Sequence, residues 1–139
     1  MAISGPMGCI EGIRELADAA FKDAATPEIL EIFLFSNDET IDSATVDADL
    51  TEITTNGGEV MELTKATFAV ATDADPVVSR WNSTTGCVWT ITGALSVYGW
   101  AIRGKTSNKI YYAENHGLNT LANGNTYTQQ PVDLKLDIV

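Results

Sequence analysis

The sequence predicts a mainly β protein, a two-sheet sandwich of jelly-roll-like arrangement with one amphipathic helix at its N-terminus. Short β-prone segments follow one another at regular spacing from about residue 28 to residue 139, separated by turns rich in Gly, Asn and Asp. Only one segment has helical periodicity and it precedes all the strands, which disfavours a parallel sheet with helical crossovers. A chain of 139 residues fits one domain, expected over residues 1–139.

The N-terminal helix is expected over about residues 7–24. Apolar residues, among them Ile10, Ile13 and Phe21, recur there at helical spacing, and charged residues occupy the opposite face. The helix is expected to stop before Pro27, because the residue preceding a proline is pushed out of the helical region.

The first strand and the loop after it have different compositions. Glu28 to Ser36 is a nearly continuous apolar run, too short for an isolated helix, which predicts a central strand buried on both faces. An acidic loop follows over residues 37–49, and its spacing does not match a helix-loop-helix calcium site. It is therefore expected to be a solvated loop that faces water, with an incidental Ca²⁺ site as the alternative. The acidic residues concerned are Asp38, Glu39, Asp42, Asp47 and Asp49.

Further β-prone segments follow, with turns at residues 56–58 and 73–76 and a loop at 115–125. The last one alternates between apolar and charged residues up to Ile138, so one of its faces is expected to be buried and the other wet. The segments span residues 50–55, 59–64, 67–72, 78–81, 88–92, 95–102, 110–114 and 132–139.

The net charge of -11 makes nucleic acid and anionic membranes poor partners, because the protein repels phosphate groups. The first residues lack a basic stretch followed by a long apolar one, and no run approaches the roughly 20 apolar residues of a membrane span. We therefore expect synthesis and folding in the cytoplasm. Cys9 and Cys87 do not have the spacing of a metal or redox motif and are expected to be buried thiols.

The sequence offers little for catalysis, so we expect a non-enzymatic protein without cofactor or bound metal. Its one histidine, His116, lies in a polar stretch, and no motif supplies a nucleophile or an orienting carboxylate. His116 is expected to be a hydrogen-bonded loop or interface residue. The aromatic residues of the second half either fill the sheet core or face outward as interface anchors. The candidate interface residues are Ile10, Ile13, Phe21, Trp100, Tyr112 and His116.

Five short motifs also occur in an order that resembles small structural proteins of tailed bacteriophages. Each motif alone is short, and the resemblance lies in their order along nearly the whole chain. The turn at Asn56-Gly57-Gly58 departs from it, since the similar proteins often have Gly-Tyr there. The motifs are LFSND at Leu34–Asp38, TEITTNG at Thr51–Gly57, VYGW at Val97–Trp100, YAE at Tyr112–Glu114 and GNT at Gly124–Thr126.

This resemblance implies a location in the virion and brings no catalytic residues with it. The leading interpretation is a capsid cement or decoration protein that bridges neighbouring major capsid subunits, with a homotrimer favoured. The alternative is a tail fibre, baseplate or adhesin component that binds host glycan or another tail protein. Copy number separates the two, because a cement protein is present in hundreds of copies and a tail component in a handful.

Overall fold

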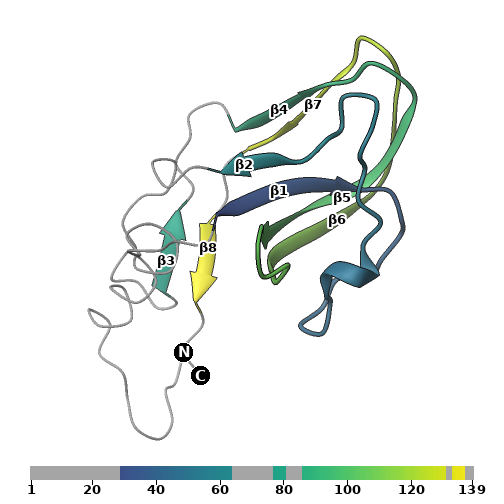
Figure 1. Cartoon of the computed structure of the whole chain (residues 1–139). Helices are drawn as coiled ribbons and strands as arrows, with labels where there is room; N and C mark the ends of the chain where they lie inside the picture. Colours follow the sequence, from purple (N-terminus) through teal and green to yellow (C-terminus); the bar gives the residue numbers. More distant parts are fainter. Residues whose placement is uncertain (1–28, 64–76, 81–85, 131–132, 137–139) are drawn as a thin grey trace, which may run out of the picture. The chain divides into compact units, whose positions relative to one another are not determined.

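The structure is a computed structural model that describes residues 29–63, 77–80, 86–130 and 133–136. These residues form eight strands in sheets of four, two and two, and every strand pair is antiparallel (Figure 1). The prediction of a mainly β protein is confirmed. The predicted helix over residues 7–24 and the predicted strand over 67–72 lie outside the described residues.

The chain groups into two compact units, which are described separately. One consists of residues 29–63 and 85–130, and the other of residues 1–28, 64–84 and 131–139. The expectation of one domain over residues 1–139 stays a prediction.

The first unit contains the four-stranded sheet, whose strand order is β2-β1-β5-β6. The strands are β1 (Leu30–Phe35), β2 (Met61–Leu63), β5 (Leu95–Gly104) and β6 (Ile110–Leu121). All six residues of β1 are buried, because it lies between β2 and β5 and carries apolar side chains on both faces. The prediction of a central strand here is confirmed.

The segment that follows β1, residues 36–53, folds back over one face of this sheet. Leu50 of the segment packs into one cluster with Phe33, Phe35 and Ala101. The backbone N–H of Ile53 donates to a carbonyl oxygen of β1 at 2.9 Å. The predicted strand at residues 50–55 is wrong, because this backbone meets the sheet in one isolated bridge and then leaves it. The segment also contains a short 3₁₀ helix, η2 (Asp47–Asp49).

A second sheet of the same unit pairs β4 (Cys87–Thr90) with β7 (Thr126–Gln129). The side chain of Trp89 on β4 is fully buried and packs edge to face against Tyr127 on β7, with ring centroids 5.8 Å apart. The Nε1 of Trp89 donates to the backbone oxygen of Glu59 at 2.8 Å, so its one polar atom is satisfied. This bond ties β4 to the stretch that leads into β2.

The other unit contains a small sheet of β3 (Val77–Arg80) and β8 (Asp133–Leu136). β3 confirms the segment predicted at 78–81 over residues 78–80 and begins one residue earlier, at Val77. β8 confirms the central part of the segment predicted at 132–139.

Candidate functional site

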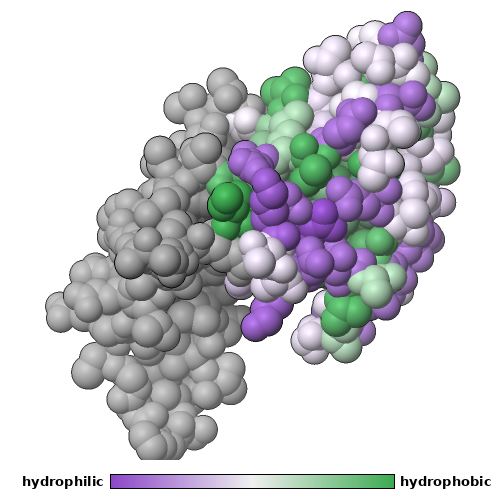
Figure 2. Space-filling model, in the orientation of Figure 1, coloured by the Kyte–Doolittle hydropathy of each residue, from purple (hydrophilic) through white to green (hydrophobic). Residues whose placement is uncertain are grey.

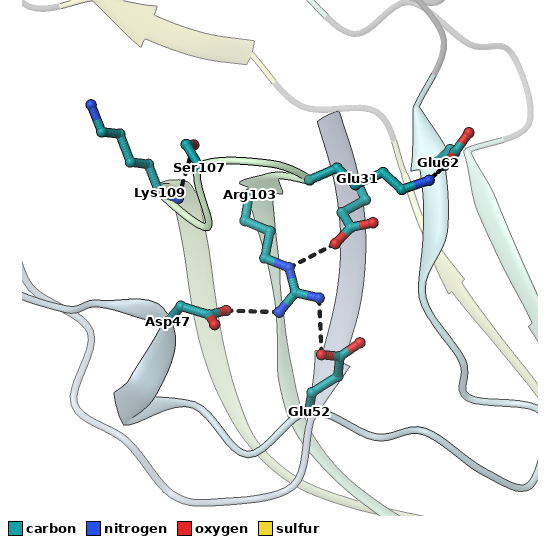
Figure 3. A network of polar contacts seen from close by, with 8 residues as sticks. Glu31, Asp47, Glu52, Glu62, Arg103, Ser107 and Lys109 are labelled. Carbon is teal, nitrogen blue, oxygen red and sulfur yellow. Dashed lines mark hydrogen bonds and ion pairs between the residues drawn. The ribbon is translucent and has the colours of Figure 1, made fainter. Parts of the chain in front are cut away.

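The side chain of Arg103 on β5 connects three separate parts of the chain (Figure 3). Its Nε donates to Glu31 Oε1 of β1 at 2.8 Å, its Nη1 to Asp47 Oδ1 at 2.7 Å and its Nη2 to Glu52 Oε2 at 2.9 Å. The guanidinium carbon lies 4.4 Å from the centroid of the Phe33 ring, within the range of a cation–π contact. Arg103 therefore binds segment 36–53, which includes the predicted acidic loop and is called the acidic segment below, to the four-stranded sheet.

The strand register explains why this pairing forms. Glu31 is the one charged residue of β1, it is 6% exposed, and it lies directly opposite Arg103. A carboxylate at such a buried position needs a partner. Burial by itself would lower the pKa of Arg103, but hydrogen bonds to Asp47, Glu31 and Glu52 outweigh it and raise the pKa. The arginine therefore stays charged and acts as a structural clamp. Figure 2 shows hydrophilic residues gathered over this part of the sheet.

The acidic segment is more ordered than a solvated loop. Asp42 and Asp49 each accept a backbone N–H within the segment, at 2.8 and 2.9 Å. Asp38 Oδ1 accepts from Asn115 of β6 at 2.9 Å. Asp38, Asp42 and Asp49 are exposed as expected, but the prediction that the loop faces water is wrong for Asp47, whose carboxylate turns inward to the clamp. In the described part of the chain, no group of three or more potential ligands is arranged to hold a metal ion.

Strand β6 forms one edge of the four-stranded sheet. Among the described residues its one strand neighbour is β5, although it is twelve residues long. Tyr111, Tyr112 and Leu118 are 41%, 38% and 57% exposed. The strand contains no proline and one charged residue, Glu114. Edge strands of soluble proteins are usually shorter, covered or protected by lysines, so β6 is the leading candidate for a contact surface.

Two irregularities divide β6. Between the pairs Val97↔Asn119 and Gly99↔Asn115, residues 116–118 of β6 lie opposite the single Tyr98 of β5. A second shift in register occurs beside Tyr111. Such bulges interrupt the ladder and change the direction of side chains. The stretch between them, residues 112–115, pairs regularly with β5.

The larger bulge is fastened to the second sheet through His116. A carbonyl oxygen can only accept, so His116 Nδ1, 3.2 Å from the Gly117 oxygen, carries the proton. Nε2 is then free to accept from the hydroxyl of Tyr127, and the two rings stack with centroids 5.8 Å apart. Because both ring nitrogens are engaged, His116 has a structural role here, and its exposed position leaves the ring available for contact with another protein.

Alkaline pH is expected to weaken this unit, because two buried groups resist ionisation. Burial raises the pKa of Cys87 to about 11, and burial followed by the charge of Glu114 raises the pKa of Tyr127 to about 12. Both are neutral when protonated, so their contribution to stability is complete below the unfolded-state pKa values, about 9 and 10, and is lost as the pH rises through the folded-state values.

The measurement is the free energy of unfolding in urea at several values between pH 8 and pH 11. Cys87→Ala and Tyr127→Phe should each show a smaller decline with pH than the unmodified protein, each relative to its own value at pH 8. A decline unaltered in both variants would contradict the assignment.

The structure separates the residues that the sequence proposed for an interface. Tyr112 and His116 lie on β6 and are exposed. Trp100 is fully buried and stacks on Tyr112, with ring centroids 5.5 Å apart, so it is a core residue and not a surface anchor. Its indole nitrogen has no hydrogen-bond partner within the described part of the chain. The remaining candidates lie outside the described residues: Ile10, Ile13 and Phe21.

Sequence reasoning missed Arg103 and Leu118. A signal for Arg103 existed, since it and Glu31 are lone, opposite charges inside two apolar strands. Leu118 gave no signal, because a single leucine in the polar stretch ENHGLNT does not indicate a strand.

Within the described residues, no helix has the length and apolarity that crossing a membrane requires. Comparison of the chain with models of protein families, with curated proteins and with solved structures finds no match.

Proposed function

We propose that this chain is a non-enzymatic structural protein of a tailed-phage particle and that it attaches to a neighbouring virion protein through β6. The observation that carries the proposal is the exposure of a twelve-residue edge strand. A surface of this kind favours association with another chain, because its backbone groups and its exposed Tyr111, Tyr112 and Leu118 all gain from being covered.

The form of the proposal that we favour is a capsid decoration protein with a jelly-roll arrangement, a homotrimer that bridges neighbouring major capsid subunits. Several simultaneous contacts raise the effective concentration, so each can be weak. The net charge of -11 supports this use, since like-charged copies stay soluble at high local concentration. The resemblance of the motif order to phage structural proteins supports the virion location.

A second candidate is a tail fibre, baseplate or adhesin component that binds glycan or another tail protein. The neighbouring exposed tyrosines at positions 111 and 112 favour it, because aromatic rings are common anchors in such contacts. A sugar ligand would be expected to contact mainly the rings of Tyr111 and Tyr112. A capsid partner would be expected to contact β6 over more residues than these two.

Electron cryomicroscopy of purified particles tests the proposal. We expect density for this chain in many ordered copies on the capsid, with β6 turned toward a neighbouring protein. Density in a few copies on the tail would favour the second candidate. If the chain is absent from purified particles, both forms of the proposal fail.

A further inference from the structure

We infer that the outer edge of β6 is completed by a short, extended, basic segment of the partner, which adds as a strand along Tyr112–Asn115. This deepens the proposed function and rests on it only for the identity of the partner as a virion protein. The inference itself depends on the backbone geometry of β6 and on the charges beside it.

The length of the added strand follows from the two bulges. Residues 112–115 pair regularly with β5, as in Trp100↔Glu114 and Ala101↔Ala113. An antiparallel strand directs alternate backbone groups away from its neighbour, so with β5 as its strand partner among the described residues this stretch has N–H and C=O groups directed toward an incoming chain. The register shifts on either side end the regular backbone. The site therefore accepts about four residues, and a partner strand cannot extend along the whole edge.

The chemistry of the added strand follows from the charges at this stretch. Glu114 and Asn115 are consecutive residues, so their side chains point to opposite faces of the sheet. Asn115 Nδ2 donates to the Asp38 carboxylate at 2.9 Å, which places a second negative charge on its face. Of the three cations in β5 and the hairpin after it, Arg103 and Lys105 are bound to carboxylates, and Lys109 precedes β6, three residues before the site begins. A lysine or arginine in the added strand therefore meets a carboxylate on either face.

A second copy of this chain fits the edge less well. Pairing β6 with its own counterpart would bring two acidic segments together, and each copy carries a net charge of -11. Like charges across an interface oppose association. The homotrimer of the proposed function must therefore use another surface, and this edge is left to a basic partner.

A matched pair of peptides tests strand addition. The probes are acetylated and amidated Lys-Val-Lys-Val-Lys, which can extend a sheet, and Lys-Pro-Lys-Pro-Lys, which has the same charge but lacks two backbone donors. Titration of the ¹⁵N-labelled full chain with the valine peptide should give chemical-shift changes centred on residues 110–116. The dissociation constant of the proline peptide should be at least about tenfold higher. Equal binding of both peptides, no binding of either, or shifts centred elsewhere would overturn the inference.

A matched pair of variants tests the role of charge. Glu114→Lys should weaken binding of the valine peptide at least about fivefold, while Glu59→Lys, an equal charge change at an exposed residue outside β6, should change it less than about twofold. Equal weakening would indicate only a general effect of net charge and would contradict the inference. Particle incorporation of the unmodified chain is measured separately, so failure of the peptide result leaves the virion assignment standing.

Discussion

Replacing Arg103 with methionine is expected to lower the free energy of unfolding by about 3–5 kcal/mol at pH 7. The change leaves the buried Glu31 carboxylate without a counterion and removes the contacts that hold Asp47 and Glu52. Urea unfolding monitored by the tryptophan fluorescence of the full chain measures this loss.

Lys105→Met is the matched control. The Lys105 pair with Glu62 belongs to the same region, but both side chains are about half exposed, so its removal should leave the unfolding midpoint nearly unchanged. If Arg103→Met does not fold, Arg103→Lys can be measured instead. It keeps the positive charge but cannot bind three carboxylates in the same geometry, so it should lower the free energy of unfolding measurably, but by less than the loss of about 3–5 kcal/mol expected for methionine. Equal stability of the Arg103→Met and Lys105→Met proteins would show that the clamp contributes nothing.

Replacing Gly99 with alanine is expected to lower the free energy of unfolding by about 3 kcal/mol. A Cβ atom at this position would lie 1.9 Å from the backbone oxygen of Glu114 and 2.6 Å from the ring of Phe35. Neither group can yield easily, because one is the backbone of β6 and the other is fully buried. β6 must therefore move away from β5, and chemical shifts across residues 112–118 should change together with the stability.

Gly117→Ala separates this steric effect from backbone strain. Gly117 has φ of +86° and nothing within 4 Å of the position where a Cβ would lie. Its replacement should cost about 1–2 kcal/mol, from the left-handed conformation alone. If Gly99→Ala lowers the free energy of unfolding no more than Gly117→Ala does, β6 does not approach β5 at the bulge as closely as described.

Strands with continuous apolar runs were predictable from the sequence, and polar ones were not. The run at Glu28–Ser36 predicted β1 because burial on both faces requires apolar residues throughout. β6 was expected to end at residue 114, and residues 115–125 were expected to form a loop, but the strand continues to Leu121. Its pairing with β5 and its exposed side chains make a polar composition acceptable there. β7 has the polar sequence TYTQ and was not predicted.

The clamp could not be derived from local patterns. Glu31, Asp47 and Glu52 lie 72, 56 and 51 residues from Arg103 in the sequence. Their meeting depends on the register between β1 and β5 and on the path of segment 36–53, and both are set by long-range pairing. The acidic residues therefore suggested a solvated loop, although one of them forms a half-buried ion pair.

Residue-resolved amide hydrogen exchange of the free protein tests whether segment 36–53, which Arg103 binds, stays on the sheet and whether β6 is an open edge. The amides of Ser36 and Ile53, bonded to the oxygens of Thr51 and Leu34, should be protected. Along residues 112–115, neighbouring amides should differ about 100-fold in exchange rate, because alternate N–H groups face β5 and solvent. Uniform protection of residues 112–115 would show that the edge of β6 is covered, and rapid exchange at Ser36 and Ile53 would show that segment 36–53 is not held on the sheet.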